Sequence, residues 1–319
     1  MTEAHAGVMS GKFDHIDIHE WLRHANLALT YACKQEQLKY CHYQAYMIEA
    51  SQEQMRLTAE LKRAIVNHEF EVYYQPVIDL QDGSISGAEA LVRWHNPTRG
   101  LVSPLAFIPL AEENGMIIEI GQQILTQACY ETKQQIELGI WPTSFALHVN
   151  LSVRELLHPD YVPMLHDILT STQLPASNLT LEVTESRLVS QPLLTKQILG
   201  KLRALGIHIA IDDFGTGYSS LTYLTQLPFD TLKIDRSFVS QMLDSENHAA
   251  IVAAIITMTG KFNAEIVAEG VETAEQAQHL KQLGCRYAQG FYYSRPKPLA
   301  EWDIDNDASH SQQQYTTAI

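Results

Sequence analysis

The sequence predicts an α/β protein in which eight strands form a TIM-like barrel surrounded by helices. From residue 70 onward, short runs of β-like alternation are separated by helical segments, which is the pattern of a parallel α/β domain. This stretch covers roughly 240 residues, the usual size of such a barrel. Most of the predicted strands also end in a polar residue, as strands around a barrel active site do.

The segments before and after the barrel have a different character. In this 319-residue chain, residues 1–13 are small and polar and predict a disordered N-terminus. Residues 14–67 predict a helical leader, because apolar residues recur at three and four and neither Pro nor Gly interrupts them. The barrel domain is expected over 68–300. Residues 301–319, rich in Asp, Ser and Gln, predict a flexible tail.

Alternation and length define the elements of the barrel. The predicted strands are residues 71–77, 87–94, 145–151, 179–185, 207–213, 231–235, 264–270 and 286–292. The predicted helices between them are residues 104–115, 117–137, 193–206, 248–262 and 273–284.

Side chains of a strand alternate between its two faces, which predicts the residues that point into the barrel. In residues 207–213, the isoleucines share one face and should pack under helices, whereas Asp212 points inward. His148 also points inward but lies deeper, and we interpret it as a packed core histidine. The same reasoning places one polar residue at the inward end of each strand: Gln75, Glu89, Asn150, Glu182, Asp212, Lys233, Glu269 and Gln289.

With Asp213, which follows Asp212, the barrel mouth carries five acids, and their charges require compensation. Two like charges about 4 Å apart repel by roughly 4 kcal/mol at an effective dielectric of 20, so the group must share protons or bind cations. Oxygen ligands favour Mg²⁺ or Mn²⁺ over zinc. The adjacent Asp212 and Asp213 allow two ions, the arrangement used for in-line attack on a phosphodiester. The glycines of FGTGYSS, which follow Asp213, fit a phosphate cradle, a mobile lid or a plain turn.

Composition excludes several classes of protein. A formal net charge of −15 argues against binding to long nucleic acid or to an anionic membrane. The four cysteines form no CxxC pair, so neither a disulfide scaffold nor a zinc site is expected. No leader peptide or membrane-spanning run is evident, so we expect a cytoplasmic chain, either alone or as the cytosolic part of a larger sensor.

Eight ordered motifs then resemble one family. They are YYQPVIDL, GAEALVRW, HVNLS, LEVTES, DDFGTGYSSL, LKIDRSFV, VAEGVET and AQGFYYSRP. Together they resemble the EAL-domain family of cyclic di-GMP phosphodiesterases, named for Glu89, Ala90 and Leu91. The resemblance implies hydrolysis of cyclic di-GMP to linear pGpG with two Mg²⁺ or Mn²⁺ ions. It also implies an EAL-type barrel whose first strand is antiparallel, and a homodimer.

The resemblance also implies roles for individual residues, each at the position that matches the family motif. Glu89, Asn150, Glu182 and Asp212 look like ligands of the first metal. Asp213 and Glu269 look like ligands of the second, and Glu269 is also the candidate general base, although the ions themselves can make a base dispensable. Lys233 looks like the residue that holds the attacking water. The implied substrate contacts are Gln75, Leu91, Arg93, Asp235 and Gln289, and the acids implied to support the DDFGTG loop are Glu185 and Glu272.

The leader carries a weaker resemblance. Residues 14–50 are similar to the end of a GGDEF domain, with an unrelated pair of regulatory helices as the alternative. Since no catalytic position of the eight EAL motifs is substituted, catalysis is the favoured reading. The alternatives are a cyclic di-GMP receptor that does not cleave, and a latent enzyme that needs an upstream domain or dimerisation.

Overall fold

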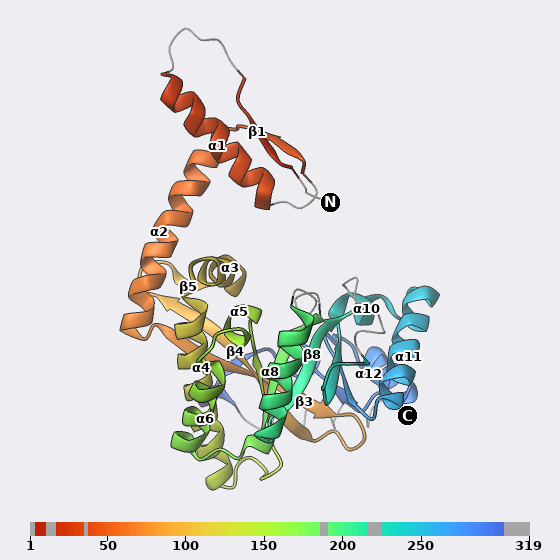
Figure 1. Ribbon diagram of the computed structural model, residues 1–319. Coiled ribbons are helices and arrows are strands. Elements are labelled where there is room, and N and C mark those ends of the chain that lie inside the picture. Colours follow the sequence, from red (N-terminus) through yellow and green to blue (C-terminus); the bar gives the residue numbers. More distant parts are fainter. Residues whose placement is uncertain (1–3, 11–16, 35–37, 186–190, 216–224, 303–319) are drawn as a thin grey trace. The chain divides into compact units, whose positions relative to one another are not determined.

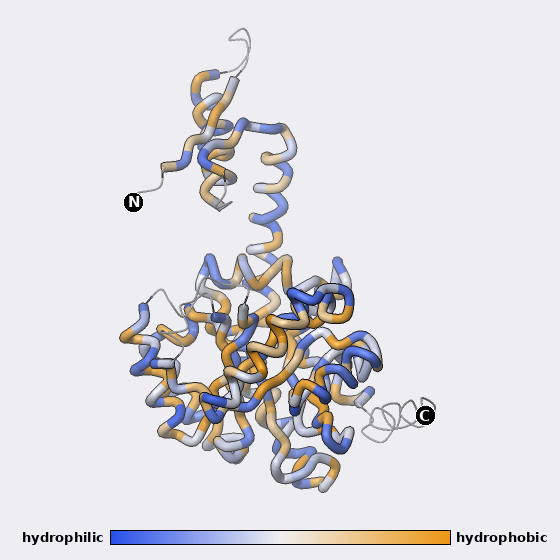
Figure 2. The backbone as a smooth tube through the Cα atoms, turned by 90° about the vertical axis from the view of Figure 1, so that its right-hand side faces the viewer, coloured by the Kyte–Doolittle hydropathy of each residue, from blue (hydrophilic) through white to orange (hydrophobic). Residues whose placement is uncertain are grey.

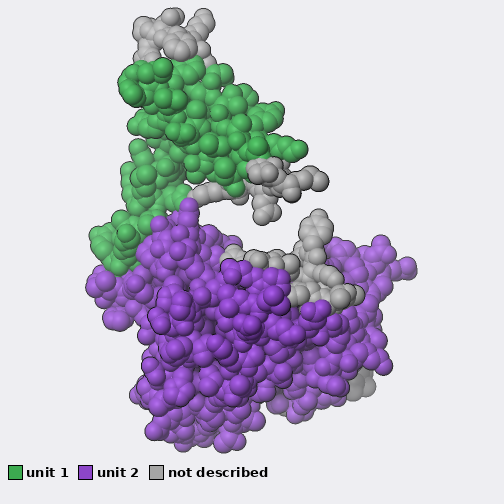
Figure 3. Space-filling model, viewed as in Figure 1, with its two compact units in different colours: residues 1–63 green, residues 64–319 purple. Residues whose placement is uncertain are grey.

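The computed structural model describes residues 4–10, 17–34, 38–185, 191–215 and 225–302 (Figure 1). The chain divides into two compact units, Met1–Arg63 and Ala64–Ile319 (Figure 3). This division lies close to the boundary predicted between the leader and the barrel. In the described part of the chain, no helix combines the length and the apolar character that crossing a bilayer requires.

The first unit is not purely helical. It contains β1 (Ala6–Val8), α1 (Ile18–Lys34), β2 (Tyr40–His42) and most of α2 (Tyr46–Asn67). β1 pairs with β2 in parallel and packs so tightly on α1 that a Cβ on Gly7 would lie 2.0 Å from the Ala25 carbonyl oxygen. The prediction of disorder is therefore wrong for Ala6–Val8, and β2 interrupts the predicted helices. Contacts with a partner 34 residues away order this stretch, and local composition does not reveal them.

The second unit is a closed barrel of eight strands, as predicted. Neighbouring strands pair around the ring, and β3 is antiparallel to both of its neighbours, β4 and β11, while the other barrel pairings are parallel. The prediction of one antiparallel strand is thus confirmed. The barrel strands are β3 (Phe70–Asp79), β4 (Ile85–Asn96), β6 (Ala146–Asn150), β7 (Leu179–Thr184), β8 (His208–Phe214), β9 (Thr231–Ile234), β10 (Glu265–Ala268) and β11 (Tyr287–Ala288). Short strands β5 (Gly100–Val102) and β12 (Lys297–Pro298) extend the sheet.

Helices surround the barrel close to the predicted ranges. These are α3 (Pro104–Asn114), α4 (Ile117–Glu137), α8 (Pro192–Ala204), α11 (Glu246–Lys261) and α12 (Ala274–Gln282). Local signals account for their ends. Thr273 and Gln276 form a capping box at the start of α12, and Gly115 ends α3 with φ 80°. The structure adds α5 (Val153–Leu156), α6 (Tyr161–Thr172) and α10 (Arg236–Gln241), with 3₁₀ turns η1 (Ala176–Asn178) and η2 (Leu299–Glu301).

The apolar core lies between the strands and the helices, and Figure 2 shows hydrophobic segments gathered inside this unit. Ile207, Ile209 and Ile211 are at most 2% exposed, in agreement with their predicted outward, helix-covered face. Burial of one such side chain contributes about 1.5–3 kcal/mol. The opposite face of the same strand carries Asp212 into the barrel, so the apolar face fixes the direction of the polar one.

Candidate metal centre at the barrel mouth

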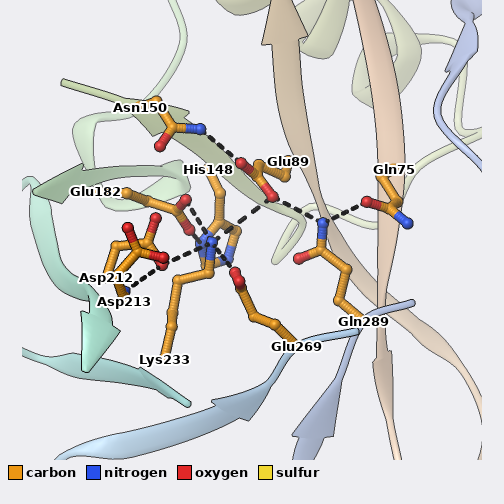
Figure 4. A network of polar contacts seen from close by, with 10 residues as sticks. All are labelled: Gln75, Glu89, His148, Asn150, Glu182, Asp212, Asp213, Lys233, Glu269 and Gln289. Atoms are coloured by element: carbon orange, nitrogen blue, oxygen red, sulfur yellow. Dashed lines mark hydrogen bonds and ion pairs between the residues drawn. The ribbon is translucent and has the colours of Figure 1, made fainter. Parts of the chain in front are cut away.

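The polar strand ends converge as the alternation predicted (Figure 4). The strand registers bring them together: Gln75 is paired with Glu89, and Asn150 with Glu182. Glu269 and Gln289 lie just beyond the ends of β10 and β11. Their backbone N–H groups nevertheless donate to the carbonyls of Ile234 and Ala268, at 3.1 and 2.9 Å, so both remain tied to the neighbouring strands.

Lys233 lies at the centre of the acids. Its side chain is 1% exposed, and Nζ lies 2.5 Å from Glu182 Oε2 and 2.5 Å from Glu269 Oε1. Glu89 Oε2 and Asp212 Oδ1 are each 3.6 Å from the same nitrogen. Four carboxylates therefore share one buried ammonium group, which leaves an excess of negative charge in the barrel mouth.

This excess charge is visible in the pKa directions. Burial would lower the pKa of Lys233, but the surrounding acids, Asp212 and Glu182 foremost, outweigh it and hold that pKa well above its usual range. Burial raises the pKa of Glu182 and of Glu269 well above the ordinary value, against the attraction of Lys233. For Glu89, Lys233 and hydrogen bonds from Gln289 and Asn150 outweigh burial, and the pKa is lowered. Bound cations would offset this excess negative charge.

A backbone irregularity turns two consecutive acids toward one site. The pairing of β8 with β9 shifts register between Ile211 and Phe214, and Asp213 has φ 54°, in the left-handed region. In a regular strand these neighbours would point to opposite faces. Here carboxylate oxygens of Asp212, Asp213 and Glu269 all lie within 4.8 Å of one another. Among residues with a side chain, Asp and Asn adopt this conformation more readily than most.

Amide side chains complete the mouth. Asn150 Nδ2 donates to Glu89 Oε1 at 2.5 Å, and Gln289 Nε2 donates to Glu89 Oε2 at 2.7 Å and to Gln75 Oε1 at 2.9 Å. Gln75 in turn donates to the Ser294 carbonyl at 3.0 Å. Among the described residues, the buried Oε1 of Gln289 has no partner. A buried acceptor without a donor beside an oxygen-rich cluster fits a site that takes hydrated Mg²⁺ or Mn²⁺.

Two cavities adjoin the cluster, and Leu91 lines both. One of about 210 Å³ is lined by Gln75, Glu89, Glu269 and Gln289 among others, and another of about 570 Å³ by Arg93, Asn150, Asp212 and Asp213 among others. The smaller cavity also contains Arg236 and Phe291, which the sequence analysis did not single out. Arg236 directly follows Asp235 in LKIDRSFV, and Phe291 lies two positions after Gln289 in AQGFYYSRP. This closeness to predicted site residues is the sequence feature that could have indicated them.

Three predicted residues play structural parts beside the site. Asp235 caps α10 by accepting from the Ser237 N–H at 3.0 Å, and it lines neither of the two cavities. Glu185 Oε2 accepts from the Gly215 N–H at 2.8 Å, at the start of the loop, whose residues 216–224 lie outside the described part of the chain. Glu272 pairs with Arg236 at 2.7 Å. The roles expected for these residues stay predictions.

His148 is buried as predicted, but it is more than packing. Its Nδ1 lies 2.9 Å from Glu182 Oε1, on the side away from the mouth. Burial, reinforced by the charge of Lys233, lowers the pKa of His148 to about 4. The ring is therefore neutral near pH 7 and contacts the acidic cluster without adding charge to it.

Comparison with known proteins places this geometry in a family. The family model described as "EAL domain" matches residues 58–296, about three quarters of the chain. The chain belongs to the EAL-domain family. The predicted recognition is thereby confirmed, and the acidic cluster lies inside the matched EAL domain.

Relatives of this EAL chain include two proteins of Pseudomonas aeruginosa. One, the bifunctional diguanylate cyclase/cyclic di-GMP phosphodiesterase MucR, is 40% identical over 283 residues, covering 89% of this chain and 41% of that protein. The cyclic di-GMP phosphodiesterase NbdA is 40% identical over 283 residues, covering 88% and 36%. The chain therefore spans about two fifths of the length of these curated relatives.

A solved structure of the MucR phosphodiesterase in complex with c-di-GMP is similar to this EAL chain in fold and sequence. It has a TM-score of 0.74 and 40% identity, and the match covers 77% of this chain and 99% of that one. The fold prediction is thus confirmed by a relative as well as by the strand topology.

Proposed function

We propose that this chain is a metal-dependent phosphodiesterase that hydrolyses cyclic di-GMP to linear pGpG. The observation that carries the proposal is the acidic cluster around Lys233, in which every expected oxygen ligand is present beside two cavities. The MucR and NbdA proteins, named as cyclic di-GMP phosphodiesterases, support the same substrate.

Two divalent ions, Mg²⁺ or Mn²⁺, fit the donor set. Glu89, Asn150, Glu182 and Asp212 would hold the first, and Asp213 and Glu269 the second. The bound ions would supply Lewis acidity that neutralises the phosphoryl oxygens and acidifies water. Glu89 acts as a catalytic residue through this ligation.

The protein's own groups orient the reactants. Lys233 Nζ contacts Glu182 and Glu269 at 2.5 Å, and the remaining donor of this ammonium group would hold the attacking water. Glu269, whose side chain is 20% exposed, would accept the proton of that water. Attack forms a P–O bond to the water oxygen and breaks the P–O3′ bond, and the released 3′ oxygen takes up a proton.

The cavities suit the two parts of a cyclic dinucleotide. Arg93 and Arg236 bring positive charge to the phosphates. Leu91 and Phe291, the latter 45% exposed, offer apolar and aromatic surface to a base. Gln75 and Gln289 provide polar contacts in the smaller cavity, and we retain Asp235, which lines neither cavity, as a substrate contact implied by the family resemblance. Glu185, through the Gly215 N–H, and Glu272 are proposed to support the adjoining loop.

The test is to incubate the purified chain with cyclic di-GMP and Mg²⁺ or Mn²⁺ and to follow pGpG by chromatography. We expect Glu89→Ala to reduce turnover roughly 100-fold or more, because even the loss of a group that only hydrogen-bonds to a metal ligand typically costs about 10- to 100-fold. The matched control Glu137→Ala removes an acid that is 61% exposed on α4 and should act as wild type. Binding of cyclic di-GMP without formation of pGpG, at saturating metal and nucleotide, would contradict the proposed enzyme and support the receptor alternative.

Regulation and assembly extend the proposal. We infer a homodimer, as the family resemblance implies, and a latent enzyme would show turnover per chain that rises with protein concentration. Residues 14–50 are proposed to be the end of a GGDEF domain, since the 283 residues aligned with the bifunctional MucR exceed the EAL match of 58–296. All four cysteines are free, which suits the reducing cytoplasm where we place the reaction.

A further inference from the structure

His148 occupies a position that links the two ends of the barrel. It precedes Asn150 by two residues in β6 and so shares its inward face, about 6 to 7 Å deeper along the strand. It is 6% exposed, and its strand position pairs with Glu89 on one side and Thr180 on the other. Figure 4 shows its ring among the acids, next to Glu182 and Lys233.

The two oxygens of Glu182 are held by different partners. Oε2 lies 2.5 Å from Lys233 Nζ, and Oε1 lies 2.9 Å from His148 Nδ1. A carboxylate that binds a cation can only accept hydrogen bonds, so Nδ1 must carry the proton and donate. With Lys233 Nζ on one oxygen and His148 Nδ1 on the other, both oxygens of the ligating carboxylate are held.

The other side of His148 faces a third cavity. A polar funnel of about 820 Å³ opens at the end of the barrel opposite the catalytic mouth. His148 and Thr180 line its inner part, whereas His208, Asp230 and Arg286 belong to the first residues of, or the turns before, the parallel strands at its rim. The histidine can therefore be reached without passing the catalytic site.

We propose that His148 is a positioning residue that holds Glu182 in its metal-ligating orientation. The space that its imidazole ring fills is accessible from the funnel at the opposite end of the barrel. This rests on the proposed metal centre and deepens it. Hydrogen bonds to ligating carboxylates typically change metal affinity by about 10- to 100-fold. The contribution of His148 should therefore appear as metal affinity rather than as a change of fold.

The experiment measures Mn²⁺ binding to the full chain without nucleotide, from the electron paramagnetic resonance signal of free Mn²⁺. We expect His148→Ala to weaken binding about 10-fold or more. His148→Asn, whose amide nitrogen can take the place of Nδ1, should restore most of the affinity. His208→Ala is the matched control, because His208 lines the same funnel with a side chain that is 49% exposed and lies 3.8 Å from Asp230, outside the cluster.

A second arm uses the funnel. Free imidazole added to His148→Ala should recover part of the lost affinity, while wild type and His208→Ala do not respond. Wild-type affinity in His148→Ala, or equal losses in the Ala and Asn variants, would overturn the positioning role while leaving wild-type hydrolysis intact. No recovery with imidazole would overturn the access route, and failure of wild type to bind Mn²⁺ would remove the metal centre itself.

Discussion

Glu155 should make the stability of this protein depend on pH near neutrality. It lies in α5, is 5% exposed, and accepts hydrogen bonds from the Ser152 N–H at 3.0 Å and from its hydroxyl at 2.5 Å. Gly121 on α4 leaves room for it, since a Cβ there would lie 1.7 Å from Oε1. Burial raises the pKa of Glu155 to about 7 despite these hydrogen bonds.

The sign and size follow from linkage. The folded pKa lies above the ordinary 4.5, so folding favours the protonated form. The stabilisation is fully present below about pH 4.5 and is lost as the pH rises through 7. At about 1.4 kcal/mol for each pH unit between the two pKa values, the loss by pH 8 is about 3 kcal/mol.

Glu155→Gln is the perturbation, because Gln keeps an acceptor for Ser152 but cannot ionise. Urea unfolding at pH 5, 6, 7 and 8 gives the free energy of unfolding of both proteins. We expect the free energy of unfolding of the variant, relative to that of wild type, to rise by about 3 kcal/mol between pH 5 and 8. Glu137→Gln, at a 61% exposed site, should show no such trend. A difference between Glu155→Gln and wild type that is the same at every pH would refute the reasoning.

Two further predictions concern the mouth. Lys233→Met leaves its four acids without their ammonium group, so the free energy of unfolding in EDTA should be about 3–5 kcal/mol lower than that of wild type. Mn²⁺ should restore part of this loss. Equal losses with and without Mn²⁺ would contradict a cation site. Gly270→Ala should destabilise by about 2 kcal/mol or more in urea unfolding, because Gly270 has φ 67° and a Cβ would lie 2.2 Å from Arg236 Cγ. Gly83→Ala, at φ 76° with nothing within 4 Å, isolates the backbone cost, and equal losses in the two variants would exclude the contact with Arg236.

Much of the site was predictable because period-two alternation and barrel closure need only local information. Gln75, Glu89, Asn150 and Lys233 follow from the apolar faces of their strands. The meeting of Asp212 and Asp213 depends on a register shift and a left-handed residue, which strand periodicity does not encode.

Other features of the site depend on distances between strands, which the sequence pattern does not provide. The depth of His148 was predicted, but its contact with Glu182 depends on the stagger of β6 against β7. Arg236 and Phe291 follow strand ends, where the direction of a side chain is set by the turn rather than by the strand. The order of Ala6–Val8 arises from pairing with β2, which a polar segment does not reveal.

The reversed direction of β3 changes where the chain enters the barrel. Gln75 pairs with Glu89, and Phe70 pairs with Trp94, five positions further toward the catalytic end of β4. In an all-parallel barrel the first strand would begin at the far end. Here the polypeptide arrives at the rim that carries the acidic cluster, and Asp79 reaches the opposite funnel. The helix that precedes β3 therefore joins the barrel within a few residues of the acidic cluster, so the antiparallel strand places the entry of the chain next to the candidate metal centre.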